Sequence, residues 1–474
     1  MTHALMFLPA TELAARIRAR ELSPVDLTEA MLAAAEASQP RSNAFVTVCF
    51  DEALATAREA EAAVTANRPL GPLHGLPLVV KDLVRTAGIR TTYGSRTHAD
   101  HVPEHDALVV SRLKRAGAIV IGKTTTPEFG HKTLTDAPLT GVTRNPWDSR
   151  RTCGGSSGGT AAAIAAGIGP LGLGTDGGGS IRIPAACCGI VGLKPTLGRV
   201  AYPEADDTFS NMSHYGPMTR TVGDARLMLA AMAGPDREDA SSYRLAPHAT
   251  MDAPLAARPG DLRVGWLPRV GDHPLEHEVE ASALAFTRVL ETQGATVETL
   301  ELDVVAEEDT FVTILRSGLW ARSRGLLASR RALISDSFAR SIELGEAVTA
   351  RHLHDALIRR SALFRRVQRV LERVDVVVSP ALTAPAVDVT QGHFDPVTIA
   401  GETHASLRTG WHPYAFFANL TGHPAISVPS GWSHEGLPLA VQVLGPYGGE
   451  ALLLDIAERW EQHQPWAERR PPTL

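Results

Sequence analysis

Two glycine-rich turns contain the serines that are best placed for covalent chemistry. The first turn, residues 154–159, reads Gly-Gly-Ser-Ser-Gly-Gly and holds Ser156 and Ser157, and the second, residues 177–180, reads Gly-Gly-Gly-Ser and ends at Ser180. Glycine allows backbone N–H groups to converge without side-chain obstruction, which the stabilisation of an oxyanion requires. Because only one expected helix and one expected strand separate the turns, we expect both to face one site.

A single lysine is a second candidate for chemistry. Only five of the 46 basic residues are lysines, so arginine is the default cation of this chain. Arginine keeps its proton in proteins, whereas a buried lysine can lose it. Lys81 follows the apolar run 76–80, and this setting calls for a chemical explanation. An ion pair with Asp82 is the alternative, but adjacent residues on a strand point to opposite faces.

These residues lie at the ends of elements that are expected to alternate between strand and helix. Residues 76–81 are predicted to form a buried strand, residues 105–116 a helix and residues 118–122 a second strand. A helix over 160–166 and a strand over 171–174 separate the two serine turns. This alternation predicts an α/β fold in which the elements share one sheet.

Other motifs point to different chemistries. The first serine turn also fits the G-x-S-x-G elbow of α/β-hydrolases, with Ser156 or Ser157 as the nucleophile. That motif needs a histidine further along the chain, and no later histidine has a distinguishing setting. Ser111 and Lys114 match the S-x-x-K motif of penicillin-recognising enzymes, but on an ordinary amphipathic helix. The later histidines in question are His404, His412, His423 and His434.

A metal centre and a thiol nucleophile are weaker hypotheses. His98, His101, His105 and Asp106 are close in sequence, but their segment is polar and typical of a loop. Cys153 precedes the first serine turn, yet no histidine with a pairing role lies near it in sequence. The four cysteines lack metal-ligand spacing, and a reduced chain in the cytoplasm is the expected state.

Composition excludes several classes of function. The chain of 474 residues carries a net charge of −6, with 44% hydrophobic and 21% charged residues, which is the balance of a soluble globular enzyme. No long basic run supports nucleic-acid binding. The longest weakly polar stretch, residues 160–174, is too short to span a bilayer. We therefore expect neither a nucleic-acid nor a membrane partner.

Several segments together resemble the amidase signature family. Residues 174–184 read Gly-Thr-Asp-Gly-Gly-Gly-Ser-Ile-Arg-Ile-Pro and residues 192–196 read Gly-Leu-Lys-Pro-Thr, in addition to the first serine turn. Residues 76–82 look like the lysine strand of the family, and residues 143–148 also match. The set, in this order along the chain, is highly specific.

The resemblance, which covers residues 70–235 closely and residues 418–445 more loosely, implies a role for each candidate. Ser180 corresponds to the acyl-accepting serine, Ser156 to the cis-serine of the family and Lys81 to its base. A neutral lysine takes a proton from the second serine, which takes one from the nucleophile as it attacks a carbonyl carbon. The N–H groups expected to bind the oxyanion are those of Gly177, Gly178 and Gly179, together with that of Ser180.

This relay requires an unusual lysine and a firmly held turn. The pKa of Lys81 must fall from about 10.4 towards about 7 or 8, through burial among apolar neighbours. Asp176 and Arg182 flank the nucleophile and are expected to brace the turn rather than react. Ser157 is either a helix cap or a second hydrogen-bonding partner in the site. The family uses no metal or cofactor, so none is implied here.

The resemblance also implies a single amidase domain over residues 1–474, with a large mixed β-sheet core covered by α-helices. Within it we expect a helical N-terminal wrap over 1–65 and the signature core over 70–235. A helical covering segment over 274–372 and a return to the core sheet with a C-terminal helix over 376–474 complete the expected domain.

Hydrolysis of a carboxamide is the expected activity, with an aryl amide as a candidate substrate and esters or carbamates as side substrates. One alternative is a glutaminase-type A subunit of a tRNA-dependent amidotransferase, although no glutamine-binding arginine and acid can be placed from sequence. A urethane or carbamate hydrolase is another alternative. A catalytically silent binding protein is a third, and the intact Lys81, Ser156 and Ser180 disfavour it. A small-molecule amide is the expected partner, and a homodimer is left open. Substrate contacts are expected from residues 126–133, 207–218, 311–320 and 411–417.

Overall fold

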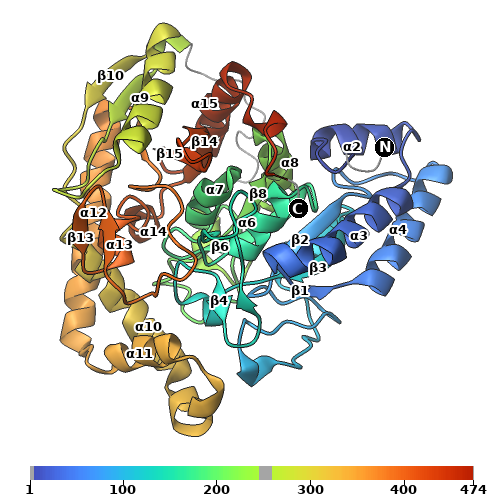
Figure 1. The fold of residues 1–474 in the computed structure, drawn as a ribbon, viewed down its shortest axis with the longest axis horizontal. Helices are drawn as coiled ribbons and strands as arrows, with labels where there is room; N and C mark the ends of the chain where they lie inside the picture. Colours follow the sequence, from blue (N-terminus) through green and yellow to red (C-terminus); the bar gives the residue numbers. More distant parts are fainter. Residues whose placement is uncertain (1–4, 245–258, 473–474) are drawn as a thin grey trace.

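One sheet of eleven strands runs through the molecule and collects strands from the whole length of the chain (Figure 1). The computed structural model describes residues 5–244 and 259–472. The strands of this sheet are β1 (Phe45–Val48), β2 (Pro77–Lys81), β3 (Ile119–Thr124), β6 (Leu171–Asp176), β7 (Val191–Lys194), β8 (His214–Thr219), β9 (Arg263–Trp266), β10 (Thr296–Thr299), β11 (Val376–Pro380), β14 (Ala425–Trp432) and β15 (Pro438–Leu444). Two small sheets pair β4 (Asp136–Ala137) with β5 (Gly141–Val142) and β12 (Val397–Ile399) with β13 (Glu402–His404).

The order of the strands is β1-β3-β2-β6-β8-β7-β14-β15-β11-β9-β10, and their directions are mixed. β2 lies parallel to both β3 and β6, whereas β6 is antiparallel to β8, and β7 is antiparallel to β8 and β14. The two strands that carry the candidate residues at their ends, β2 and β6, are therefore direct neighbours in the middle of the sheet. The predicted α/β fold with a large mixed sheet is confirmed.

Helices surround this sheet, and the two largest helical groups lie on opposite sides of it in Figure 1. α2, α3 and α4 form the group drawn in blue, and α10, α11 and α12 form the yellow and orange group. No helix within the described ranges is both long and apolar enough to cross a membrane. The helices are α2 (Ala10–Arg18), α3 (Pro24–Ser42), α4 (Phe50–Thr65), α5 (Leu108–Arg115), α6 (Gly158–Ala165), α7 (Arg182–Cys188), α8 (Val222–Met232), α9 (His277–Thr292), α10 (Glu307–Arg330), α11 (Asp336–Glu346), α12 (Ala350–Arg373), α13 (Leu407–Gly410), α14 (Phe417–Thr421) and α15 (Glu450–His463).

Short 3₁₀ helices complete the described elements. They are η1 (Arg96–His98), η2 (Glu128–Gly130), η3 (Ala240–Arg244), η4 (Pro259–Asp261), η5 (Arg331–Leu333) and η6 (Trp466–Glu468).

Residues 10–65 form the helices α2, α3 and α4, with the strand β1 between α3 and α4. α3 begins at Pro24 because the Ser23 hydroxyl accepts the N–H groups of the first turn and proline fits the first helical position. β1, with its Phe-Val-Thr-Val sequence, pairs antiparallel with β3 at the edge of the sheet. The covering segment over 274–372 is likewise helical apart from β10, an edge strand that pairs with β9. The helix expected over 105–116 begins at Leu108.

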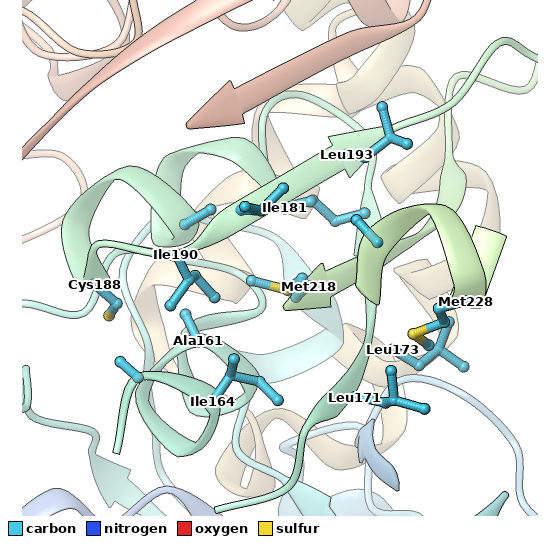
Figure 2. Packing of buried hydrophobic residues seen from close by; sticks show 14 of the residues in the cluster. Ala161, Ile164, Leu171, Leu173, Ile181, Cys188, Ile190, Leu193, Met218 and Met228 are labelled. Carbon is cyan, nitrogen blue, oxygen red and sulfur yellow. The ribbon is translucent and has the colours of Figure 1, made fainter. Parts of the chain in front are cut away.

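The elements beside the two serine turns pack into the main core. Figure 2 shows Ala161 and Ile164 of α6 facing Leu171 of β6 and Met218 of β8. Each of these side chains is buried, and full burial of an apolar side chain of Ile or Leu size contributes roughly 1.5–3 kcal/mol. Both serine turns therefore begin or end on tightly packed elements, which limits their movement.

Candidate active site

Lys81 is the last residue of β2, and its amine is fully buried beside the first serine turn. Its Nζ lies 2.7 Å from Ser156 Oγ and 2.9 Å from Thr175 Oγ1. Asp82, the next residue, faces elsewhere and accepts the Thr92 N–H at 3.0 Å. The alternative interpretation of Lys81 as an ion pair with its neighbour is therefore not the observed arrangement.

Burial lowers the pKa of Lys81 well below its ordinary value, and the negative charge of Asp176 opposes this shift only in part. A neutral amine has a lone pair and accepts a proton, whereas an ammonium group cannot. The direction of the pKa shift is the one that a lysine base requires. The 2.7 Å contact then joins a potential base to the hydroxyl of Ser156.

The first serine turn is fixed by its neighbours on both sides. The Gly155–Ser156 peptide bond is cis. The Ser157 hydroxyl contacts the backbone of Thr175, accepting its N–H at 3.3 Å and donating to its carbonyl at 3.2 Å. The Ser157 N–H donates to the carbonyl of Ser180 at 3.2 Å. Ser157 therefore ties β6 and the second serine turn to the first, and its side chain does not cap α6.

The second serine turn is organised by Asp176, the last residue of β6. Its carboxylate accepts the Gly179 N–H at 2.6 Å and the Ile181 N–H at 3.2 Å, and it pairs with Arg182 Nε at 3.0 Å. Burial raises the pKa of Asp176, but the Arg182 guanidinium and further donors more than offset this and hold it below its usual range. Asp176 thus stays charged and braces the turn, as the sequence predicts.

This bracing removes one of the N–H donors that were predicted to bind the oxyanion. The Gly179 N–H is already directed to the Asp176 carboxylate, so it is not free to bind an oxyanion. The N–H groups of Gly177, Gly178 and Ser180 donate no hydrogen bond to another residue within 5–244 and 259–472. Gly179 keeps a structural role, since its φ of +113° is a conformation that other residues rarely adopt.

Ser180 follows this turn and keeps a small accessible surface of 9%. Its hydroxyl has no hydrogen-bond partner in the part of the chain that the structure describes. The structure thus brings the three sequence-predicted residues to one place: Lys81 contacts Ser156 directly, and the main chain of Ser180 is hydrogen-bonded to the residue that follows Ser156.

All four segments that were predicted to contact substrate reach the serine turns. A Cβ atom on Gly178 would come 2.5 Å from Phe311 Cζ, and one on Gly179 would come 2.6 Å from Ala415 Cβ. A Cβ on Gly177 would lie 3.2 Å from Ser213 Oγ, and one on Gly130 would lie 3.3 Å from Ser156 Oγ. Each of these segments therefore has a residue close to one of the serine turns.

Two further lysines, Lys123 and Lys194, are fully buried, which sequence reasoning missed. Lys194 Nζ lies 3.3 Å from His214 Nε2, and His214 Nδ1 lies 3.2 Å from the carbonyl of Asp176. Lys123 donates to Thr91 Oγ1 at 2.8 Å, and burial lowers its pKa to about 8. The scarcity of lysine was the available signal, because it applies to these two residues as it does to Lys81.

The residues of the competing hypotheses lie elsewhere or are inert. Asp106 pairs with Lys114 at 2.8 Å, so the S-x-x-K lysine is occupied by a surface ion pair. His98 packs edge-on against Tyr93, with ring centres 5.2 Å apart. The structure, over the residues that it describes, contains no group of three or more side chains able to hold a metal ion. Burial raises the pKa of Cys153 to about 12, which disfavours its thiolate.

Comparisons with known proteins agree with this geometry. A model of the Amidase family matches residues 26–454. The chain is 36% identical over 476 residues to the Acylamidase of Rhodococcus erythropolis, covering 98% of each chain. It is 35% identical to the A subunit of the glutamyl-tRNA(Gln) amidotransferase of Chloroflexus aggregans, covering 96% of each chain. A solved bacterial aryl acylamidase superposes with a TM-score of 0.90 at 28% identity, over 98% of this chain and 97% of that one.

The fold and the site therefore define an amide-hydrolysing enzyme. The chain belongs to the Amidase family, and the superposed aryl acylamidase is described as an amidase signature enzyme. The resemblance inferred from the serine turns and the lysine strand is confirmed.

Proposed function

We propose that the protein hydrolyses acyl amides, with aryl amides as preferred substrates, through an acyl-enzyme on Ser180. The observation that carries this proposal is the 2.7 Å contact between the buried Lys81 amine and the Ser156 hydroxyl. It lies next to a turn in which three N–H groups have no partner among the described residues. The names of the related Acylamidase and of the superposed aryl acylamidase support the same substrate class.

The proposed reaction begins with neutral Lys81. Its lone pair accepts the proton of Ser156, whose oxygen accepts the proton of Ser180 as Ser180 Oγ forms a bond to the carbonyl carbon. The N–H groups of Gly177, Gly178 and Ser180 bind the resulting oxyanion, each contributing on the order of 3 kcal/mol. As the C–N bond breaks, Ser156 returns a proton to the leaving amine. Water then attacks the ester along the same relay and releases the carboxylic acid.

Aromatic side chains near both serine turns favour an aryl group in the substrate. Phe311 stands against Gly178, and its ring centre lies 5.7 Å from that of Phe416. On the other side, Phe129 precedes Gly130 at the first serine turn and stacks on Phe338 at 5.0 Å. Offset and edge-on contacts of this kind extend naturally to an aromatic ring of a bound substrate.

A second candidate is the glutaminase-type A subunit, because several related sequences bear that name. Glutamine, carbamates and esters therefore belong in the same substrate panel as aryl anilides and short aliphatic amides. Aryl anilides turned over at least tenfold faster than glutamine support the proposal, and the reverse order replaces it with the second candidate. The buried state of all four free cysteines supports a reducing, cytoplasmic location.

A covalent probe tests the role of Ser180 directly. A fluorophosphonate should label the purified protein once, and peptide mass spectrometry should place the label on Ser180. The Ser180→Ala variant should remain unlabelled, whereas Ser157→Ala, whose hydroxyl only holds Thr175, should still be labelled. Labelling of Ser156 or Ser157 in the wild-type protein would contradict the proposal.

A further inference from the structure

A largely buried arginine lies one aromatic ring away from the proposed oxyanion site. Arg408 belongs to α13, and its guanidinium carbon is 4.7 Å from the centre of the Phe311 ring. The far edge of the same ring stands against Gly178 of the second serine turn. Only 12% of the Arg408 side chain is exposed. A positive charge is thus held close to the carbonyl group on which Ser180 acts in the proposed function.

The protein itself uses little of the hydrogen-bonding capacity of this guanidinium. The nearest carboxylate oxygen, Glu308 Oε1, is 3.7 Å from Arg408 Nε, which is too long for a hydrogen bond. Arg408 donates no hydrogen bond to any residue within 5–244 and 259–472, although a guanidinium has five N–H donors. Burial lowers the pKa of Arg408 to about 10, so it is charged at neutral pH.

The charges around Arg408 leave an excess of positive charge. Arg408 shares its one acidic neighbour, Glu308, with Arg316, on which Asp309 and Arg340 also act. The neighbouring Asp309 is held by Arg359 at 2.6 Å. Three histidines in this region are neutral because burial lowers their pKa values. They are His131, His393 and His412.

His412 adds a ring nitrogen, Nδ1, that has no partner among the described residues. The residue is 1% exposed, and its Nε2 lies 3.1 Å from Thr133 Oγ1. The positive charge of Arg408 acts on this ring. Three residues later, Ala415 stands against Gly179 of the second serine turn. The segment that carries Arg408 and His412 therefore also reaches the second serine turn.

We propose that Arg408 is a specificity-determining residue that binds a carboxylate of the substrate, so that the preferred amides carry an acidic group. This inference rests on the proposed hydrolysis at Ser180. The planar guanidinium matches a carboxylate through two parallel hydrogen bonds, and the cation–π contact with Phe311 holds it in place. Glu308 limits the movement of the guanidinium without occupying its terminal nitrogens.

Two matched substrate pairs test the proposal and locate the acidic group. In the first pair, the 4-nitroanilides of succinic and butyric acids differ by a carboxylate in the acyl part. In the second pair, 4-acetamidobenzoate and acetanilide differ by a carboxylate in the amine part. The wild-type enzyme should show kcat/KM at least tenfold higher for the acidic member of one pair, and the pair concerned identifies the side on which Arg408 binds.

The variants Arg408→Met and Arg359→Met separate recognition from structure. R408M should lose at least tenfold in kcat/KM for the preferred acidic amide, mainly through KM, and stay within threefold of wild type for its neutral counterpart. R359M, which removes a surface cation of the same cover, should leave kcat/KM unchanged for both the acidic and the neutral amide. If R408M does not fold, Arg408→Lys keeps the charge but loses the two-pronged geometry and should lower the acid preference at least threefold.

Two results would overturn the inference while leaving the proposed function intact. One is the absence of an acid preference in both pairs although the neutral amides are hydrolysed in a Ser180-dependent manner. The other is an equal loss of kcat/KM for the acidic and the neutral amide in R408M. That result would show that Arg408 has only the structural role of holding Phe311. If no amide in either pair is hydrolysed, the failure lies with the proposed substrate class instead.

Discussion

Asp176, in the core that carries the serine turns, and Arg408, in the cover formed by α10–α13, use their charges in opposite ways. In the core, the Asp176 carboxylate binds two N–H groups and Arg182, and Arg182 also reaches Asn419 Oδ1 at 2.7 Å. In the cover, Arg408 has one distant acid and no hydrogen bond among the described residues. Saturated polar groups fix a geometry, whereas unsaturated ones remain available to a ligand. We infer that the core performs the reaction and the cover selects the substrate.

The largest effect should come from the nucleophile. Replacing Ser180 by alanine removes the atom that forms the acyl-enzyme, and kcat for any amide substrate should fall by at least about 10⁴-fold. Thermal unfolding should stay close to that of the wild type, because the Ser180 hydroxyl has no partner among the described residues. Residual activity within tenfold of wild type would show that Ser180 is not the nucleophile. The contrast between a reacting core and a selecting cover would then fail.

Loss of the base should have the next largest effect. Lys81→Met should lower kcat/KM by about 10²–10⁴-fold, as expected for a general base. Because burial lowers the pKa of Lys81, the amine is protonated below that value and neutral above it. In the wild-type enzyme kcat/KM should therefore rise with pH and reach a plateau, and K81M should lack this rise.

Lys123→Met is the matched control for Lys81, since Lys123 is equally buried but bonds to Thr91 instead of a serine of the site. Measured with the same substrate, K123M should retain the rising pH profile whatever its effect on stability. A K81M enzyme with an unchanged pH profile would show that another group supplies the base.

Removing the brace of the second serine turn should affect stability and activity together. Asp176→Asn leaves the Arg182 charge buried, at 1% exposure, without its carboxylate and should cost about 3–5 kcal/mol of unfolding free energy. Arg182 and further donors hold the pKa of Asp176 below its usual range, so the carboxylate contributes stability above the unfolded pKa of about 3.9. That contribution is lost as the pH falls through the folded pKa.

Denaturant titrations between about pH 3 and 7 measure this contribution. The wild type should lose stability towards acid more steeply than D176N, because only the wild type has the carboxylate to protonate. Parallel curves for the two proteins would contradict the bracing role, and so would a D176N enzyme with wild-type kcat.

Much of this core could be predicted because its signals are local in sequence. The apolar strand ending at Lys81 and the glycines before Ser180 depend on neighbouring residues alone, and β2 and both serine turns lie where the sequence placed them. The helix at the C-terminal end is found over Glu450–His463, within the segment expected to return to the core. Local patterns of this kind follow from backbone preference and burial.

The parts that escaped prediction depend on contacts between distant segments. The bond between Gly179 and Asp176 depends on a side-chain orientation that no pattern states. Arg408 and Phe311 are almost a hundred residues apart, and only the tertiary fold brings the guanidinium over the Phe311 ring. The edge strand β10 was hidden within a helical segment, because an exposed four-residue strand has little hydrophobic signal.

The smallest effect is expected outside both regions, at the competing S-x-x-K motif. Lys114 lies on α5 and pairs with Asp106 at 2.8 Å, with 35% of its side chain exposed. Partly exposed ion pairs of this kind contribute about 0–1 kcal/mol, so Lys114→Met should lower the unfolding free energy by no more than that and change kcat/KM less than twofold. Urea titration and the anilide assay measure both quantities. A tenfold loss of activity in K114M would indicate that the catalytic lysine is Lys114 on α5 and not Lys81 on β2. The reaction could then no longer be assigned to the buried core.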